Sequence, residues 1–78
     1  SEARISRRDE KLAARFYYYA EILKLNYSSI MSKLSEEFDI DETVVSARLK
    51  EKQIVLDKLF KDKPSVRLLR RQYPFYCW

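Results

Sequence analysis

The sequence predicts an all-α fold, on three observations. Glycine is absent and proline occurs only at Pro64 and Pro74, so the chain lacks the residues that hairpins and left-handed turns usually need. Apolar residues recur with the period of a helix rather than alternating as in a strand. The length of 78 residues allows one domain. We therefore expect a single helical domain over residues 1–78, a small bundle of about four helices.

The first helix is expected over roughly residues 5–25. At ~100° per residue, five apolar side chains share one narrow arc, and these are Ile5, Leu12, Phe16, Tyr19 and Leu23. This arc is expected to face the core. Tyr17 points away from it, so we expect the Tyr17 hydroxyl to lie in water.

A second helix is expected to begin near Asn26 or Ser28, both good N-cap residues, and to run to about Phe38. Asp39 is expected to end this helix in the left-handed conformation, which aspartate tolerates better than most residues. Asp41 is then expected to cap a third helix, its carboxylate accepting from free backbone N–H groups.

An apolar stripe continues from Glu42 to Lys63 and predicts either one long helix or two helices with a bend near Lys52. A last short helix is expected over residues 65–72, followed by the aromatic tail YPFYCW at residues 73–78. We expect this tail to pack on the helices, because four aromatic rings in water would promote aggregation.

The segment from about residue 28 to residue 52 carries the pattern of a helix-turn-helix. That pattern needs an apolar and then a small residue in the first helix, a left-handed turn, a cap, and an apolar pair that docks the second helix. The matching residues are Leu34, Ser35, Phe38, Asp39, Ile40, Asp41, Val45 and Leu49. The segment resembles the helix-turn-helix family shared by many repressors, resolvases, transposase DNA-binding domains and the promoter-reading region of sigma factors. It departs from the family where Asp39 replaces the usual Gly and Val44 replaces a Thr or Ser.

The resemblance implies binding to double-stranded DNA, with the second helix of the pair in the major groove. With Val45 and Leu49 facing inward, the residues expected to read bases are Glu42, Thr43, Ser46, Ala47 and Lys50. The residues expected to contact phosphates are Arg7, Arg8, Ser28, Lys33, Arg48 and Lys52. The expected function is that of a small transcriptional regulator or of a transposase-related accessory factor from a mobile element.

The charge distribution favours a polyanionic partner without requiring one. The net charge is +4 and the pI is near 9.3. One basic stretch, made of Arg4, Arg7, Arg8, Lys11 and Arg15, either tracks phosphates or is a solvated helix face. A second basic group, at residues 67–71, contributes to DNA binding only if the last helix lies beside the helix that reads bases.

Ile54 is expected to point outward with Ala47 and Lys50. It either marks a homodimer contact or is covered by Tyr73 or Trp78. The alternative function is a helical protein–protein interaction module without DNA binding, in which the charge serves solubility.

The sequence argues against an enzyme. It contains no histidine and no glycine, hence no glycine-rich phosphate loop, and its single cysteine, Cys77, completes neither a disulfide nor a zinc site. We therefore expect no catalytic residue, metal, cofactor or small-molecule ligand. With no signal peptide or membrane span in the sequence shown, a cytoplasmic protein is expected.

Overall fold

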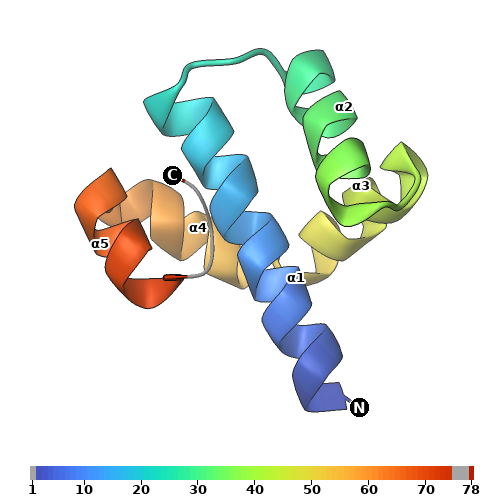
Figure 1. Cartoon of the computed structure of the whole chain (residues 1–78), viewed down its shortest axis with the longest axis horizontal. Coiled ribbons are helices and arrows are strands. Elements are labelled where there is room, and N and C mark those ends of the chain that lie inside the picture. The colour runs from blue at the N-terminus through green and yellow to red at the C-terminus, as the bar shows by residue number, and fades with distance from the viewer. Residues whose placement is uncertain (1, 75–77) are drawn as a thin grey trace.

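The computed structural model describes the backbone of residues 2–74 and 78, and the side chains of residues 8–74 and 78. Every regular element in this part of the chain is helical, which confirms the all-α class (Figure 1). The elements are α1 (Glu2–Tyr17), the π-helical segment η1 (Tyr18–Ile22), α2 (Tyr27–Phe38), α3 (Glu42–Glu51), α4 (Gln53–Asp62) and α5 (Val66–Gln72). The described residues thus form five α-helices rather than about four.

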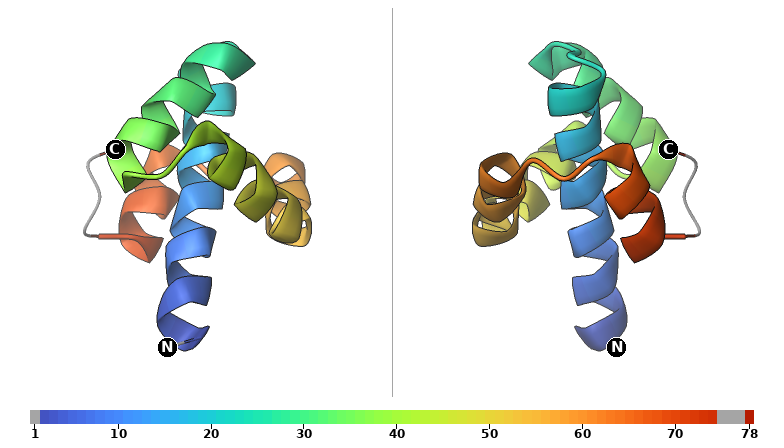
Figure 2. Two further views of the ribbon diagram at one scale, coloured as in Figure 1. Left: turned by 90° about the vertical axis from the view of Figure 1, so that its right-hand side faces the viewer. Right: turned by 90° about the vertical axis from the view of Figure 1, so that its left-hand side faces the viewer.

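Helix α1 runs through the middle of the molecule. Helices α2 and α3 lie on one side of it, and α5 lies on the other (Figures 1 and 2). Helix α1 contacts α2, α3 and α4. The core between these helices is built from Leu12, Ala13, Tyr19, Ile30, Met31, Leu34, Phe38, Val45, Leu49 and Leu56.

The central place of α1 overturns the prediction for Tyr17. Its side chain is only 1% exposed, and its hydroxyl donates a hydrogen bond of 2.7 Å to the carbonyl oxygen of Pro64. The ring of Phe60, on α4, packs edge-on against the Tyr17 ring with centroids 5.4 Å apart. The prediction assumed one buried face of α1, whereas a second face is covered by α4 and the start of α5.

The prediction for Leu23 is also wrong, because this side chain is 46% exposed. The helical run ends at Ile22, and its last turn is π-helical. The Leu23 N–H bonds to the carbonyl oxygen of Tyr18, five residues earlier. A π-helical turn holds more residues than an α-helical turn, so the ~100° spacing used for the first helix fails beyond Tyr18.

The boundaries of α2 follow the predicted signals. The Asn26 side chain accepts a hydrogen bond of 2.8 Å from the Ser29 N–H, which caps the helix. Asp39 ends it in the left-handed conformation, with φ 53° and ψ 49°. The Ser35 hydroxyl donates to the carbonyl oxygen of Ile40 at 2.6 Å, which ties the turn back to α2.

Asp41 occupies the N-cap position of α3, but its side chain makes no capping hydrogen bond, so the predicted role of its carboxylate is wrong. Its backbone carbonyl oxygen still accepts from the Val45 N–H at 3.0 Å. Because Asp41 is exposed, water can accept hydrogen bonds from the first N–H groups of α3 in place of the carboxylate.

Two helices, not one, follow the turn. The break between α3 and α4 falls at Lys52, which has φ −101° and ψ 26°. Helix α4 ends at Lys63 in the left-handed conformation, with φ 49°. Ser65 caps α5 by accepting from the Leu68 N–H. None of the described helices is long and apolar enough to cross a membrane.

The described end of the aromatic tail lies against α1. The Trp78 ring is 5.3 Å from the Tyr18 ring, centroid to centroid, and the Arg15 guanidinium lies 5.0 Å from the Trp78 ring centroid. The Trp78 indole N–H donates to the carbonyl oxygen of Tyr73. Residues 75–77 of the tail lie outside the described residues, so the packing of the whole tail stays a prediction.

Candidate nucleic-acid interface

The outer surface of α3 carries the side chains that the sequence assigned to base reading. Val45 and Leu49 are buried in the core, which fixes the rotation of α3 about its axis. Five side chains on the remaining surface are exposed, and these are Glu42, Thr43, Ser46, Ala47 and Lys50. The structure therefore brings the predicted set together on one solvent-facing helix surface.

A shallow groove adjoins this surface. Ser46 and Lys50 of α3 line it together with Gln53 of α4 and the rings of Phe16 and Tyr27, and its volume is about 320 Å³. Tyr27 stands at the first position of α2 and is exposed. Tyr27 was not among the predicted site residues, because its ring comes near α3 only through the packing of α2 against α1 and α3.

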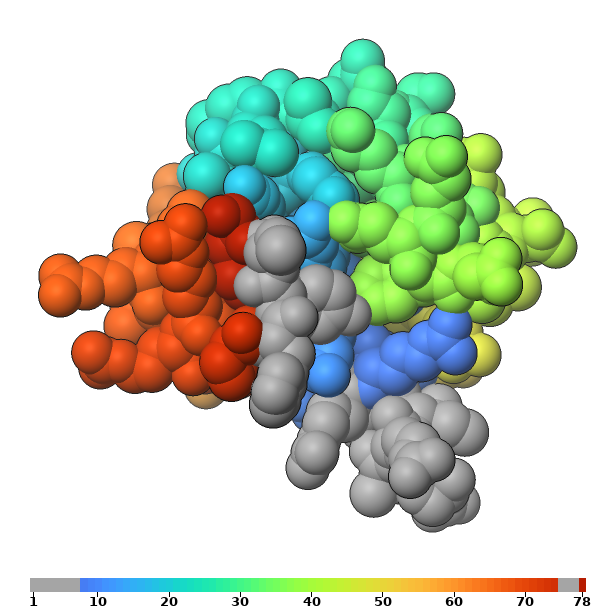
Figure 3. All heavy atoms as spheres, viewed as in Figure 1, coloured from blue at the N-terminus to red at the C-terminus, as the bar shows by residue number. Residues whose placement is uncertain are grey.

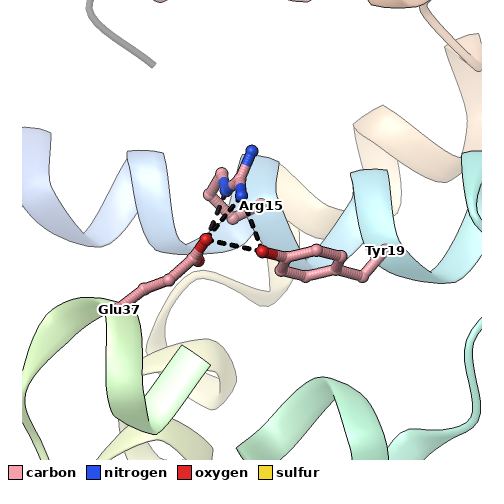
Figure 4. A network of polar contacts seen from close by, with 3 residues as sticks. All are labelled: Arg15, Tyr19 and Glu37. Carbon is pink, nitrogen blue, oxygen red and sulfur yellow. Dashed lines mark hydrogen bonds and ion pairs between the residues drawn. The ribbon is translucent and has the colours of Figure 1, made fainter. Parts of the chain in front are cut away.

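The α2–α3 pair is held to α1 by a polar network (Figure 4). The Arg15 guanidinium donates to the Tyr19 hydroxyl oxygen at 2.6 Å and forms an ion pair with the Glu37 carboxylate. The Tyr19 hydroxyl donates to the same carboxylate. Burial, and then the hydrogen bond to Glu37, raise the pKa of Tyr19 to about 12, so its hydroxyl remains a donor at neutral pH.

This network corrects the expectation for Arg15, which the sequence placed in a positive stretch free to meet phosphates. The Arg15 side chain is 8% exposed. It is enclosed by Glu37 and by the rings of Tyr18, Tyr19 and Trp78. Its charge is therefore used inside the protein, where an unpaired guanidinium would be costly.

Two residues predicted to contact phosphates also hold the pair in place. The Arg48 guanidinium of α3 donates to the Asp9 carboxylate of α1 at 3.0 Å, and the Asp9 side chain is only 6% exposed. The Arg8 guanidinium donates to the carbonyl oxygen of Phe38, the last residue of α2. Both arginines remain partly accessible, and their contact with phosphates stays a prediction.

The other predicted phosphate contacts are spread over the surface. Ser28 is exposed in the first turn of α2, and Lys33 is exposed on the same helix with its ammonium 6.0 Å from the Tyr19 ring centroid. Lys52 is half-buried at the break between α3 and α4. The side chain of Arg7 lies outside the described residues.

The charge of the molecule is unevenly divided. Residues 27–52, which include α2 and α3, contain four basic and six acidic residues, a net charge of −2. Residues 53–78 contain six basic and two acidic residues, a net charge of +4. Helix α5, which carries the arginines of the second basic group, lies across α1 from α3 (Figures 1 and 2), so this group is not on a helix beside the predicted base-reading helix.

Among the described residues, no three histidine, cysteine, aspartate or glutamate side chains gather in a way that would hold a metal ion. The comparisons with known proteins add no assignment: no family model, no curated protein and no solved structure matches the chain.

Proposed function

We propose that this protein binds DNA sequence-specifically, with α2 and α3 as a helix-turn-helix and α3 in the major groove. The observation that carries the proposal is the outer surface of α3. A short helix follows a left-handed turn, docks through Val45 and Leu49, and leaves its remaining surface exposed. A helix presented in this way fits the width of the major groove.

The exposed side chains have chemistry suited to base edges. The hydroxyls of Thr43 and Ser46 donate or accept, the Ala47 methyl matches a thymine methyl, and the Lys50 ammonium pairs with guanine acceptors. Glu42 accepts from the amino group of cytosine. The set combines one acidic side chain, one basic side chain, two hydroxyls and a methyl group. Such a mixture favours discrimination among nucleobases over general attraction to phosphate.

The negative charge of residues 27–52 has a consequence for affinity. Asp41 and Glu42 stand at the start of α3, where they interact favourably with the helix dipole but repel phosphates. Binding by this surface alone is therefore weak for random sequences, and its energy comes mainly from matched bases. Replacing Glu42 with Gln is expected to raise the affinity for random duplex DNA and to lower the preference for the selected site.

Selection of a preferred sequence from a random duplex pool, followed by titration of variants, tests the proposal. Thr43→Ala, Ser46→Ala and Lys50→Ala are each expected to weaken binding to the selected site by about 1–3 kcal/mol, or roughly 5- to 150-fold. The matched control is Lys61→Ala, which removes the same charge as Lys50→Ala from an exposed position on α4. Amide shifts on DNA addition should map to residues 43–50.

Two results would contradict the proposal. One is a pool from which no sequence is enriched, and the other is unchanged site preference in all three α3 variants. In either case α3 does not read bases.

The second candidate is a protein–protein interaction module, and one observation favours it. Ile54 is 85% exposed, so neither Tyr73 nor Trp78 covers it, contrary to the simpler of the two expectations for this residue. Ile54 lies beside a groove between α4 and α5 with a volume of about 550 Å³. Apolar docking there would be nearly independent of salt, whereas DNA binding weakens steeply as salt rises.

The proposed biological role follows from DNA binding by a small domain. A base-reading domain of this size suits a small transcriptional regulator or a transposase-related accessory factor. A pool-derived site that lies at a promoter favours the first, and one at the end of a mobile element favours the second.

A further inference from the structure

The arginines of α5 form one exposed face. Arg67, Arg70 and Arg71 are all exposed, and the fully buried Leu69 points the opposite way. At ~100° per residue the three arginines fall within an arc of about 100°. In Figure 3 long side chains of α5, coloured orange to red, project from the edge of the molecule. The three guanidinium groups therefore project from the same side of α5.

Lys58 extends this charge onto α4. It lines the groove between α4 and α5 together with Arg71. Glu10 and Asp62 line the same groove, so the groove itself is not uniformly positive. The excess of positive charge comes from the outer surface of α5, next to the groove. We call Lys58, Arg67, Arg70 and Arg71 the basic face.

Most of the basic face is not committed to contacts within the protein. Lys58, Arg67 and Arg71 form no ion pair with any residue that the structure describes. Arg70 donates to the carbonyl oxygen of Trp78 at 3.1 Å and remains exposed. By contrast, Arg15 and Arg48 are paired with carboxylates of the protein. The basic face thus gathers several accessible positive charges on one part of the surface.

We propose that the basic face binds the phosphate backbone of duplex nucleic acid, on a stretch separate from the one at α3. Guanidinium groups suit phosphate because they donate in a planar fork that matches two oxygens. Helix α5, which carries three of the four residues of the face, lies across α1 from α3 (Figures 1 and 2), in a molecule measuring 30 × 28 × 23 Å. One straight duplex therefore touches one of these surfaces and not both. The separation of the two stretches rests on the proposed function of α3, whereas phosphate binding by the basic face does not.

A phosphate backbone explains the face better than a membrane surface does. Helices that lie in a membrane interface bury a long apolar side and are often 20–30 residues in length. Helix α5 has 7 residues and turns Leu69 into its own core. Its exposed surface carries three arginines and one apolar side chain, Leu68, which is far less apolar surface than such helices bury.

The salt dependence of binding to a random duplex tests the proposal. Each phosphate contact contributes about 0.9 to the slope of log affinity against log salt. Arg67→Ala/Arg71→Ala is therefore expected to lower the affinity at low salt and to reduce the slope by about 1.8. The loss of affinity between ~50 mM and ~200 mM salt should then be about tenfold smaller than in the wild type. The matched control, Lys24→Asn/Lys61→Ala, removes the same charge from exposed positions outside both surfaces. Asparagine replaces Lys24 because that residue is left-handed, with φ 58°. This control is expected to keep the wild-type slope.

Three outcomes would overturn the inference. Equal slopes in the two double variants show that net charge alone drives binding. An unchanged affinity in Arg67→Ala/Arg71→Ala shows that the face does not bind DNA. If Arg67→Ala/Arg71→Ala binds DNA as the wild type does but no longer binds vesicles of phosphatidylserine and phosphatidylcholine, the face binds a membrane instead. Thermal unfolding by circular dichroism confirms that both variants fold, as their exposed positions lead us to expect.

The same variants separate this inference from the function proposed for α3. Thr43→Ala/Ser46→Ala should lose site preference while keeping the salt slope, and Arg67→Ala/Arg71→Ala should do the reverse. If no site preference exists at all, the slope measurement still decides whether the basic face binds. Energy transfer between two differently labelled duplexes tests the separate stretches. The wild type should bring the duplexes together, and neither Thr43→Ala/Ser46→Ala nor Arg67→Ala/Arg71→Ala should do so.

Discussion

The two sides of α1 share one apolar core and differ in the contacts that accompany it. On the side of α2 and α3 the contacts include three polar links between α1 and the pair, made by Arg15, Arg48 and Arg8. On the side of α4 and α5 the contacts are mainly aromatic. Phe60 packs edge-on against Phe16 and Tyr17, and the Tyr17 hydroxyl adds one hydrogen bond.

This difference separates orientation from stability. A hydrogen bond or ion pair has a narrow range of geometry and a modest net contribution. Buried aromatic area contributes more free energy but constrains direction less. The α2–α3 side thus adds directional contacts to the apolar core in which Val45 and Leu49 dock α3, whereas the contacts that join the basic half of the molecule are mainly apolar. The two halves should respond differently to mutation.

The largest effect is expected on the aromatic side. Tyr17→Ala removes a fully buried ring and leaves a cavity beside Phe60, so the free energy of unfolding should fall by about 3–5 kcal/mol. Tyr17→Phe removes only the hydrogen bond to Pro64 and should cost about 1 kcal/mol. Urea denaturation measures both. Equal losses in the two variants would mean that the hydroxyl, not the ring, joins this side to α1.

Next in size is the response of the polar side to alkaline pH. Tyr19 ionises near pH 10 when unfolded, and burial and Glu37 raise its pKa to about 12 in the folded protein. A raised folded pKa means that the contribution to stability is complete below pH 10 and is lost as pH rises toward 12. Two pKa units correspond to about 2–3 kcal/mol.

The measurement compares wild type with Tyr19→Phe from pH 8 to pH 12. Burial also raises the pKa of Tyr17, and both proteins retain that group. The wild type should lose stability more steeply than the variant above pH 10. Parallel curves would show that Tyr19 does not titrate as its surroundings require.

A smaller loss is expected when the network in Figure 4 is broken from the α2 side. Glu37→Ala leaves the buried Arg15 guanidinium without its carboxylate. Because the Glu37 side chain is 31% exposed, water offsets part of the penalty, and the loss should be about 2 kcal/mol. Glu36→Ala, at the exposed neighbouring position, should cost under about 0.5 kcal/mol. Similar losses in both would exclude a special role for the network.

The features that sequence predicted correctly are local ones. Asn26 and Asp39 act through atoms within a few residues, so their identity alone indicates where α2 begins and ends. The exposed surface of α3 was predictable for a related reason, because the spacing of Val45 and Leu49 fixes which way the helix is turned. These signals need no knowledge of the rest of the fold.

The features that sequence missed depend on distant partners. From the sequence, Arg15 is predicted to be a surface cation. In the structure Glu37 and Trp78 enclose it. Asp9 and Arg48 are 39 residues apart, and nothing in their spacing indicates a contact. Tyr17 appeared exposed because the sequence does not show that α1 is covered on two sides. In each case tertiary packing decides the environment of the side chain.

The smallest expected effect compares the left-handed residues that end a helix on each side of α1. Lys63 ends α4 with φ 49° and Asp39 ends α2 with φ 53°. Left-handed backbone strains most non-glycine residues, and it strains aspartate less than lysine.

Lys63→Gly should therefore raise the free energy of unfolding by roughly 0.5–1 kcal/mol, and Asp39→Gly by about 0.3 kcal/mol. Lys63 also lies 3.9 Å from Glu21, but exposed pairs at this distance contribute little. Thermal unfolding measures both variants. A larger gain from Asp39→Gly would mean that the turn before α3 is the more strained of the two, and that its geometry is maintained for the presentation of α3 rather than for stability.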